Sequence, residues 1–108
     1  MLAALSLDKL KVPVIDHWWQ TETSRAISSK CTGIEMMKTK YGSACKAVPG
    51  YDVQNMKPDQ TLAKPNEMGD IVVKLPLPPW TFPTLWNADK RYKDNYMTNY
   101  EGYYETYD

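Results

Sequence analysis

Apolar residues at the start of the chain follow two successive patterns. The first is a set of leucines at loosely helical spacing, namely Leu2, Leu5, Leu7 and Leu10. Pro13 ends this pattern, because proline lacks the amide hydrogen that a helix interior requires. The β-branched residues around it, at positions 12, 14 and 15, then predict a short buried strand.

The middle of the chain predicts loops and turns around one new strand. Residues 24–40 have no clean period and many Ser, Thr and Lys residues, which predicts an exposed loop. Pro49 and Gly50 predict a turn, and Tyr51–Val53 alternates in the manner of a strand. Residues 57–67 are polar and contain two prolines, so they predict a further turn.

The strongest strand signal is the β-branched run Ile71–Val73. The prolines that follow exclude a helix interior or a central strand and predict an extended, polyproline-like segment; they are Pro76, Pro78, Pro79 and Pro83. Asn87 is a good N-cap for a short helix, and Asp89 lies in the first turn, where the helix dipole favours an anion. Gly102 precedes a final strand at residues 103–107. Together these elements predict a strand-rich α+β chain with one or two short helices.

Residues 15–23 hold the densest set of candidate binding groups. The adjacent tryptophans Trp18 and Trp19 are followed within four residues by an amide, two hydroxyls and a carboxylate. Small-molecule sites combine apolar walls with a few polar groups in this way. The segment begins where the first predicted strand ends, and ligands in α/β folds bind at the carboxyl ends of strands.

Composition argues against several other classes of site. The formal net charge is zero, with 13 basic and 13 acidic residues interspersed, which argues against a nucleic-acid or anionic membrane surface. No apolar run approaches the roughly 20 residues of a membrane-spanning helix. The distant Cys31 and Cys45 favour two free thiols in a reducing compartment over a disulfide. With one histidine in the chain, they do not make a zinc site.

Three segments resemble motifs of the short-chain acyl-CoA synthetases, the AMP-forming enzymes that activate acetate or propionate with ATP. Residues 16–23, DHWWQTET, are similar to the family's D-x-W-W-Q-T-E-T. Residues 69–79, GDIVVKLPLPP, are similar to a stretch of the propionate-type branch. Residues 104–108, YETYD, are similar to the ribose-binding motif Y-x-T-G-D of the adenylate-forming superfamily. The three segments occur in the family's order and span the chain from about residue 10 to its last residue.

The resemblance implies an internal fragment of the large N-terminal domain of a much longer adenylate-forming enzyme. Residues 1–24 would be the end of an α/β subdomain that carries the ATP and acyl motif. Residues 25–108 would form a distorted β-barrel-like subdomain that ends at the ribose motif. The family's glycine-rich phosphate loop and C-terminal catalytic lysine are not among these residues, so no catalytic residue is assigned and the chain alone is expected to lack ligase activity.

The resemblance also implies roles for individual residues. ATP and AMP would be contacted by Asp16, His17, Trp18, Trp19, Gln20, Thr21 and Asp108. Of these, Thr21 would place its hydroxyl on the α-phosphate and Asp108 would accept both ribose hydroxyls. Trp19 would also form the floor of an acyl pocket with space for two or three carbons, and the propionate-type segment favours propionate. Glu22 would bind the Mg²⁺ that bridges the ATP phosphates, and CoA would be the second substrate after the small carboxylate.

The residues by themselves leave simpler interpretations open. Glu22 alone is typical of a solvated loop, and Trp19 of an ordinary core tryptophan. Asp16 suits an Asx turn at a strand end, and Asp108 suits a solvated acid at a frayed chain end. His17 has no evident orienting partner, so a contact role is favoured over general-base catalysis.

Three residues depart from glycines of the family's motifs. Ser24 follows the T-E-T segment, Cys45 stands where a glycine is common, and Tyr107 replaces the glycine of Y-x-T-G-D. Glycine is often placed in motifs for a positive φ or a close backbone approach. These departures call the loop geometry into question, and with it the full activity of the larger protein.

Two functions follow from the sequence. The first is a fragment of an AMP-forming short-chain fatty acid–CoA ligase, located in the mitochondrial matrix or the cytoplasm. The alternative is a non-catalytic, truncated or degenerate chain that binds nucleotide weakly or serves as an interaction module.

Overall fold

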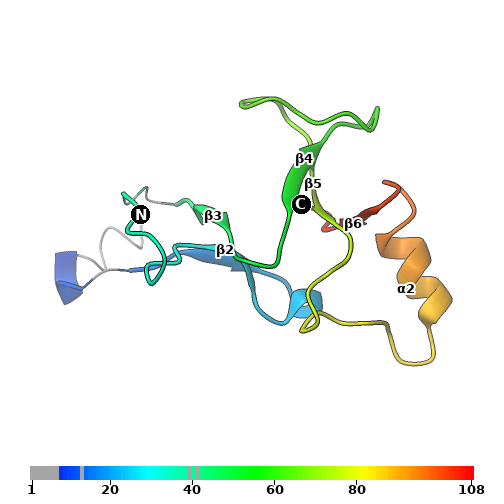
Figure 1. Ribbon diagram of the computed structural model, residues 1–108, viewed down its shortest axis with the longest axis horizontal. Helices are drawn as coiled ribbons and strands as arrows, with labels where there is room; N and C mark the ends of the chain where they lie inside the picture. The colour runs from blue at the N-terminus through cyan, green and yellow to red at the C-terminus, as the bar shows by residue number, and fades with distance from the viewer. Residues whose placement is uncertain (1–7, 13, 39, 41) are drawn as a thin grey trace. The chain divides into compact units, whose positions relative to one another are not determined.

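The computed structural model describes residues 8–12, 14–38, 40 and 42–108 (Figure 1). The chain folds as two compact units, which are residues 1–49 and residues 50–108. Each unit contains one three-stranded sheet, and these sheets have the strand orders β1-β2-β3 and β4-β5-β6. The strand-rich α+β architecture predicted from the sequence is confirmed.

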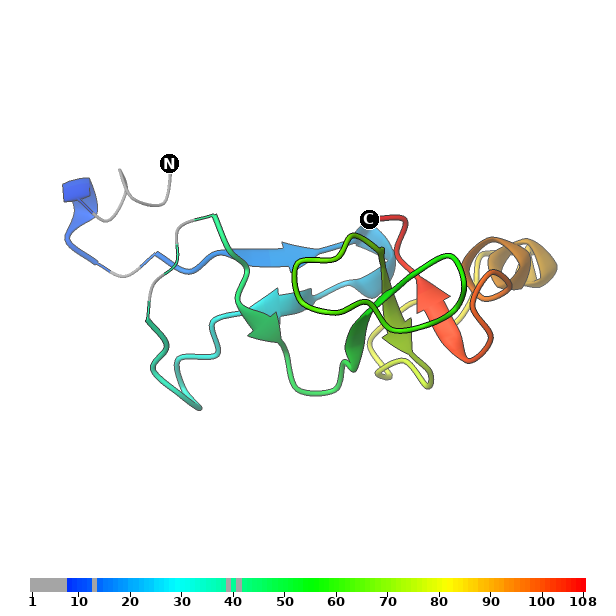
Figure 2. The same cartoon turned by 90° about the horizontal axis from the view of Figure 1, so that it is seen from above.

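The sheet of the first unit is an antiparallel meander. Its strands are β1 (His17–Trp19), β2 (Ala26–Ser29) and β3 (Lys46–Ala47), and β1 and β2 run in opposite directions (Figure 2). A 3₁₀ turn at Thr21–Thr23 connects β1 to β2. Ile27 at the centre of β2 has no exposed surface and forms the buried centre of this unit.

Two predictions for this unit were wrong. The first strand lies at His17–Trp19, whereas Val12, Val14 and Ile15, from which the strand was predicted, are not in a strand. The predicted loop at 24–40 contains β2, whose sequence Ala-Ile-Ser-Ser carries little β-propensity of its own. Pairing with β1 on one side and β3 on the other supplies the hydrogen bonds that make this segment a strand.

The predicted N-terminal helix falls mostly outside the described residues, as do Leu2, Leu5, Leu7 and Pro13. Residues 8–10, where the pattern ends, are helical. Within the part of the chain that the structure describes, no helix has the length and apolar character needed to cross a bilayer.

The sheet of the second unit has β5 (Asp70–Lys74) at its centre, between β4 (Val53–Met56) and β6 (Tyr103–Glu105). Val72 and Val73 in β5 are fully buried, as expected for the most apolar run in the chain. The predicted strand at Ile71–Val73 is therefore confirmed. The predicted final strand is confirmed too, although it ends at Glu105 and is shorter than expected.

The helix α2 (Asp89–Tyr96) follows the proline-rich loop and precedes β6 (Figure 1), and aromatic side chains join it to this sheet. Tyr92 is 3% exposed, and its hydroxyl donates to the Phe82 carbonyl at 2.8 Å. The ring of Tyr96 stacks on that of Tyr104 in β6, with centroids 5.2 Å apart and planes 5° apart. These contacts fix the helix against the strand that leads to the chain's last residues.

The start of α2 differs from the prediction. The N-cap is Ala88, and Asn87 has a left-handed backbone with a φ of 50°. Asp89 does lie in the first turn, and the Thr84 hydroxyl donates to its carboxylate at 2.5 Å. Asn tolerates the left-handed region better than most residues, so Asn87 serves the turn before the helix.

Among the described residues the strands form two separate sheets and no closed barrel. The predicted subdomain boundary between residues 24 and 25 refers to the larger fold, so it stays a prediction.

Candidate functional site

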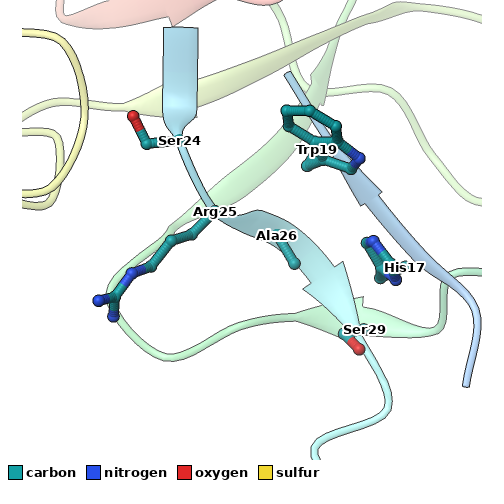
Figure 3. A pocket seen from close by; sticks show the side chains of 6 residues that line it. All are labelled: His17, Trp19, Ser24, Arg25, Ala26 and Ser29. Carbon is teal, nitrogen blue, oxygen red and sulfur yellow. The ribbon is translucent and has the colours of Figure 1, made fainter. Parts of the chain in front are cut away.

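A hollow of about 420 Å³ lies beside β1 in the first unit. Figure 3 shows the rings of His17 and Trp19 projecting from β1 towards β2, which contributes Ala26 and Ser29, while Arg25 extends away from the two rings. His17 and Trp19 are two residues apart and so share one face of the strand. Trp18, which stands between them in the sequence, is half-buried and does not line the hollow.

Trp19 is not a core residue of this unit. Its exposed fraction is 54%, whereas the nearby Ile27 has none. The hollow combines an indole, an imidazole and small hydroxyl or methyl side chains, which is the mixture of apolar wall and polar groups that small ligands use. The structure therefore places two of the predicted site residues, His17 and Trp19, around one open hollow.

The turn after β1 is organised by Thr23, whose side chain is 1% exposed. The backbone amide of Gln20 donates to Thr23 Oγ1 at 3.1 Å. The hydroxyl also lies 2.9 Å from the Gln20 carbonyl oxygen and 3.1 Å from the Arg25 carbonyl oxygen, either of which can accept its proton. Thr23 thus ties the entrance and the exit of the turn together.

Sequence reasoning did not single out Thr23 as a positioning residue. The signal was its place three residues after Gln20, where a hydroxyl can bond to the backbone of the residue that opens a helical turn. Because Thr23 points inward, the turn leaves Thr21 exposed and Glu22 half-buried. The two predicted phosphate and metal contacts are therefore adjacent, on the outer part of one short turn.

The donor set of the turn fits a magnesium ion held mainly by its substrate. Residues 8–12, 14–38, 40 and 42–108 contain no cluster of three His, Cys, Asp or Glu residues that could hold a metal. Mg²⁺ does not need such a cluster, because it usually takes one or two protein carboxylates together with phosphate oxygens and water. Glu22 can supply one carboxylate of this kind.

The three residues that stand where the resemblance leads us to expect glycine all have left-handed backbones. The φ angles are 62° at Ser24, 65° at Cys45 and 63° at Tyr107. Ser24 is the C-cap of the turn after Thr23, a position that glycine commonly takes. The loop geometry expected of glycine is therefore kept at each position, with a side chain in a strained conformation.

The Cys31 and Cys45 thiols are both free.

We expect Ser24→Gly to stabilise the first unit by about 1 kcal/mol, because glycine removes the cost of a side chain at positive φ. Urea unfolding of the isolated chain measures this change. Ser28→Gly is the matched control, since Ser28 lies inside β2 and glycine in a strand interior costs about 0.5–1 kcal/mol. Destabilisation of similar size in both variants would contradict the strain at Ser24.

The remaining predicted residues lie around these elements. Asp16 is half-buried just before β1, and Gln20 contributes its backbone groups to the turn. Asp108 belongs to the second unit, where it is exposed. Its carbonyl accepts from the Ile71 amide at 2.9 Å, which ties the end of the chain to β5.

Proteins of known sequence resemble this chain along most of its length. No protein-family model matches it. The mouse mitochondrial acyl-CoA synthetase short-chain family member 3 is 46% identical over 99 residues, which are 91% of this chain and 14% of the mouse protein. Propionate–CoA ligase of Escherichia coli is 37% identical over 92 residues, which are 82% of this chain and 14% of the bacterial protein.

A solved structure gives the same result for the fold. The crystal structure of Brucella canis acyl-CoA synthetase matches with a TM-score of 0.76 and 26% identity, over 97% of this chain and 18% of that one. The chain therefore spans about one seventh of the length of the curated relatives and has the fold of the corresponding segment of an acyl-CoA synthetase.

Proposed function

We propose that this chain, which is homologous to short-chain acyl-CoA synthetases over about nine tenths of its length, supplies part of the nucleotide and acyl site of an AMP-forming ligase. The overall reaction joins a short-chain carboxylate to CoA and converts ATP to AMP and pyrophosphate. Propionate is the preferred acid in this proposal. The observation that carries it is the arrangement at β1, where an open hollow borders a turn with an exposed hydroxyl and a half-buried carboxylate.

Each part of this arrangement has a chemical task in the proposal. Glu22 would hold a Mg²⁺ ion, which would supply positive charge next to the ATP phosphates. Thr21 would donate a hydrogen bond to an α-phosphate oxygen. Trp19 forms a wall for the alkyl tail of the acid. Asp16, His17, Trp18 and Gln20 contact the nucleotide around it, and Asp108 accepts the ribose hydroxyls.

Two features of the proposal go beyond this chain. ATP, Mg²⁺ and CoA are the small molecules that the whole ligase would use. An intracellular location, in the mitochondrial matrix or the cytoplasm, agrees with the mitochondrial label of the mouse relative. The alternative function, a non-catalytic module that binds nucleotide weakly, would share the fold and lack turnover.

The test is a chimera in which this chain replaces the matched 99-residue segment of the mouse relative. We expect propionate-dependent AMP release from the chimera and none from the isolated chain. In the chimera, Glu22→Gln should lower kcat/KM for MgATP at least about tenfold, because an amide is a weaker ligand for a hard cation. Excess Mg²⁺ should restore part of the loss.

Glu101→Gln is the matched control for this variant, because Glu101 is an exposed glutamate in the second unit. It should leave kcat/KM unchanged. A folded chimera without AMP release would favour the non-catalytic alternative. Equal activity in the Glu22→Gln and Glu101→Gln chimeras would refute Glu22 as the Mg²⁺ ligand and would leave the proposed ligase function standing.

A further inference from the structure

Thr106 links the last residue of the chain to the central strand of the second unit. Its hydroxyl donates to the Ile71 carbonyl at 2.7 Å, and its amide donates to the same oxygen at 3.2 Å. The Asp108 amide in turn donates to Thr106 Oγ1 at 3.3 Å. The Ile71 amide donates to the Asp108 carbonyl at 2.9 Å, which closes a ring of hydrogen bonds around one side chain.

The residues of this hydrogen-bonded ring differ in burial. Thr106 is 4% exposed, whereas Tyr107 and Asp108 are exposed. The hydroxyl of Thr106 uses its single proton on Ile71 and its oxygen on Asp108, so both of its hydrogen-bonding functions are in use. A valine of the same shape would provide neither.

Tyr107 holds the same segment from the opposite side. Its φ of 63° turns the chain between Thr106 and Asp108. Its ring lies edge-on to Tyr96 of α2, with centroids 6.0 Å apart, and its hydroxyl donates to the Asn95 carbonyl. The backbone that carries Asp108 is therefore fixed to β5 through Thr106 and to α2 through Tyr107.

We infer that Thr106 is a positioning residue, whose hydroxyl sets the backbone of Asp108 so that the Asp108 carboxylate can accept ribose hydroxyls. The inference rests on the proposed function, in which Asp108 contacts the ribose. Thr106 itself does not touch the nucleotide. It acts through the two hydrogen bonds that connect β5 to the backbone of residue 108.

Tyr100 provides a control for stability in the same unit. Its hydroxyl donates to the Asp70 carboxylate at 2.5 Å and is distinct from the ring around Thr106. This hydrogen bond, together with burial, raises the pKa of Tyr100 to about 12, so the phenol remains protonated in a neutral assay. Tyr100→Phe removes this partly buried hydrogen bond to Asp70, the residue before Ile71, and leaves every partner of Asp108 in place.

The experiment uses the chimera and measures the preference for ATP over 2′-deoxy-ATP, as the ratio of their kcat/KM values. We expect Thr106→Val to reduce this preference at least about tenfold, which corresponds to about 1.4 kcal/mol. Thr106→Ser, which keeps the hydroxyl, and Tyr100→Phe should both retain the preference. If Thr106→Val does not fold, Thr106→Cys, with a weak donor in place of the hydroxyl, should give the same loss.

Asp108→Asn distinguishes a failure of the positioning role of Thr106 from a failure of the ribose contact of Asp108. If Asp108→Asn loses the ribose preference while Thr106→Val retains it, the positioning role is wrong and the proposed function stands. If Asp108→Asn itself retains the preference, the ribose contact is wrong and the inference falls with it. Equal losses in Thr106→Val and Tyr100→Phe would show that general stability, and not the position of Asp108, controls the ratio.

Discussion

In the chimera, Trp19→Gly is expected to raise kcat/KM for valerate relative to propionate by about a hundredfold. Valerate has two more methylenes than propionate, and each accommodated methylene contributes about 1–3 kcal/mol. The indole of Trp19 is open to the hollow beside β1, two residues before the hydroxyl proposed to hold the α-phosphate. The acid must reach that phosphate with its carboxylate, so its alkyl tail has to meet the wall that Trp19 forms. Removal of the indole provides room for the longer tail.

Trp86→Gly is the matched control for this variant. Trp86 is 92% exposed in the loop before α2, so its removal is the same chemical change at an exposed position of the second unit. It should leave the ratio of valerate to propionate activity unchanged. If Trp19→Gly folds and keeps the original ratio, or loses activity on both acids alike, Trp19 has a packing role and does not limit acyl length.

Local chemistry was enough to predict several elements of this fold. The β-branched run Ile71–Val73 has no helical alternative, because prolines follow it closely, and it became the buried central strand. The turn at Pro49 and Gly50 could also be predicted from its residue types, because Gly50 adopts a φ of 101° that residues with a side chain avoid. Proline and glycine restrict or extend the backbone wherever they occur, so their effects do not depend on distant partners.

Pairing between distant segments decided the elements that the sequence did not predict. β2 is rich in serine, and only its position between β1 and β3 makes it a strand. The same pairing decides which tryptophan faces the hollow, because residues alternate across a strand whose register is set by its partners. The residue types of the site could therefore be predicted from the motif, whereas the structure was needed to show that Trp19 lines the hollow and Trp18 does not.

The positioning residues were harder to recognise than the contact residues for a related reason. Thr23 and Thr106 are buried and bond to backbone atoms, so their importance depends on the turn and strand geometry around them. In the sequence each is a small polar residue next to a more conspicuous carboxylate or aromatic residue. Hydroxyl groups that bond to nearby backbone atoms are common in turns, and their presence alone does not identify the one that organises a site.

Thr23→Val should lower the free energy of unfolding of the first unit by about 2–3 kcal/mol. The variant keeps the shape of the buried side chain and removes its hydroxyl. The Gln20 backbone amide then loses the acceptor it has at 3.1 Å, and whichever of the Gln20 and Arg25 carbonyls accepts the hydroxyl proton loses that hydrogen bond. A partly buried donor left without its partner costs about 1–3 kcal/mol, and a lost hydrogen bond about 0.5–1.5 kcal/mol. Because the turn sets the spacing between β1 and β2, this loss should spread through the sheet of the first unit.

Urea unfolding of the isolated chain, followed by the separate indole N–H resonances of its tryptophans, measures this effect in each unit. The resonances of Trp18 and Trp19 report on the first unit, and that of Trp80, whose indole donates to the Tyr51 hydroxyl at 2.9 Å, reports on the second. We expect Thr23→Val to shift the unfolding of Trp18 and Trp19 to lower urea concentration. The control Thr21→Val, at an exposed position of the same turn, should shift it little. If both variants unfold at the same urea concentration as the unaltered chain, the hydroxyl of Thr23 does not organise the turn, and the exposure of Thr21 must have another cause.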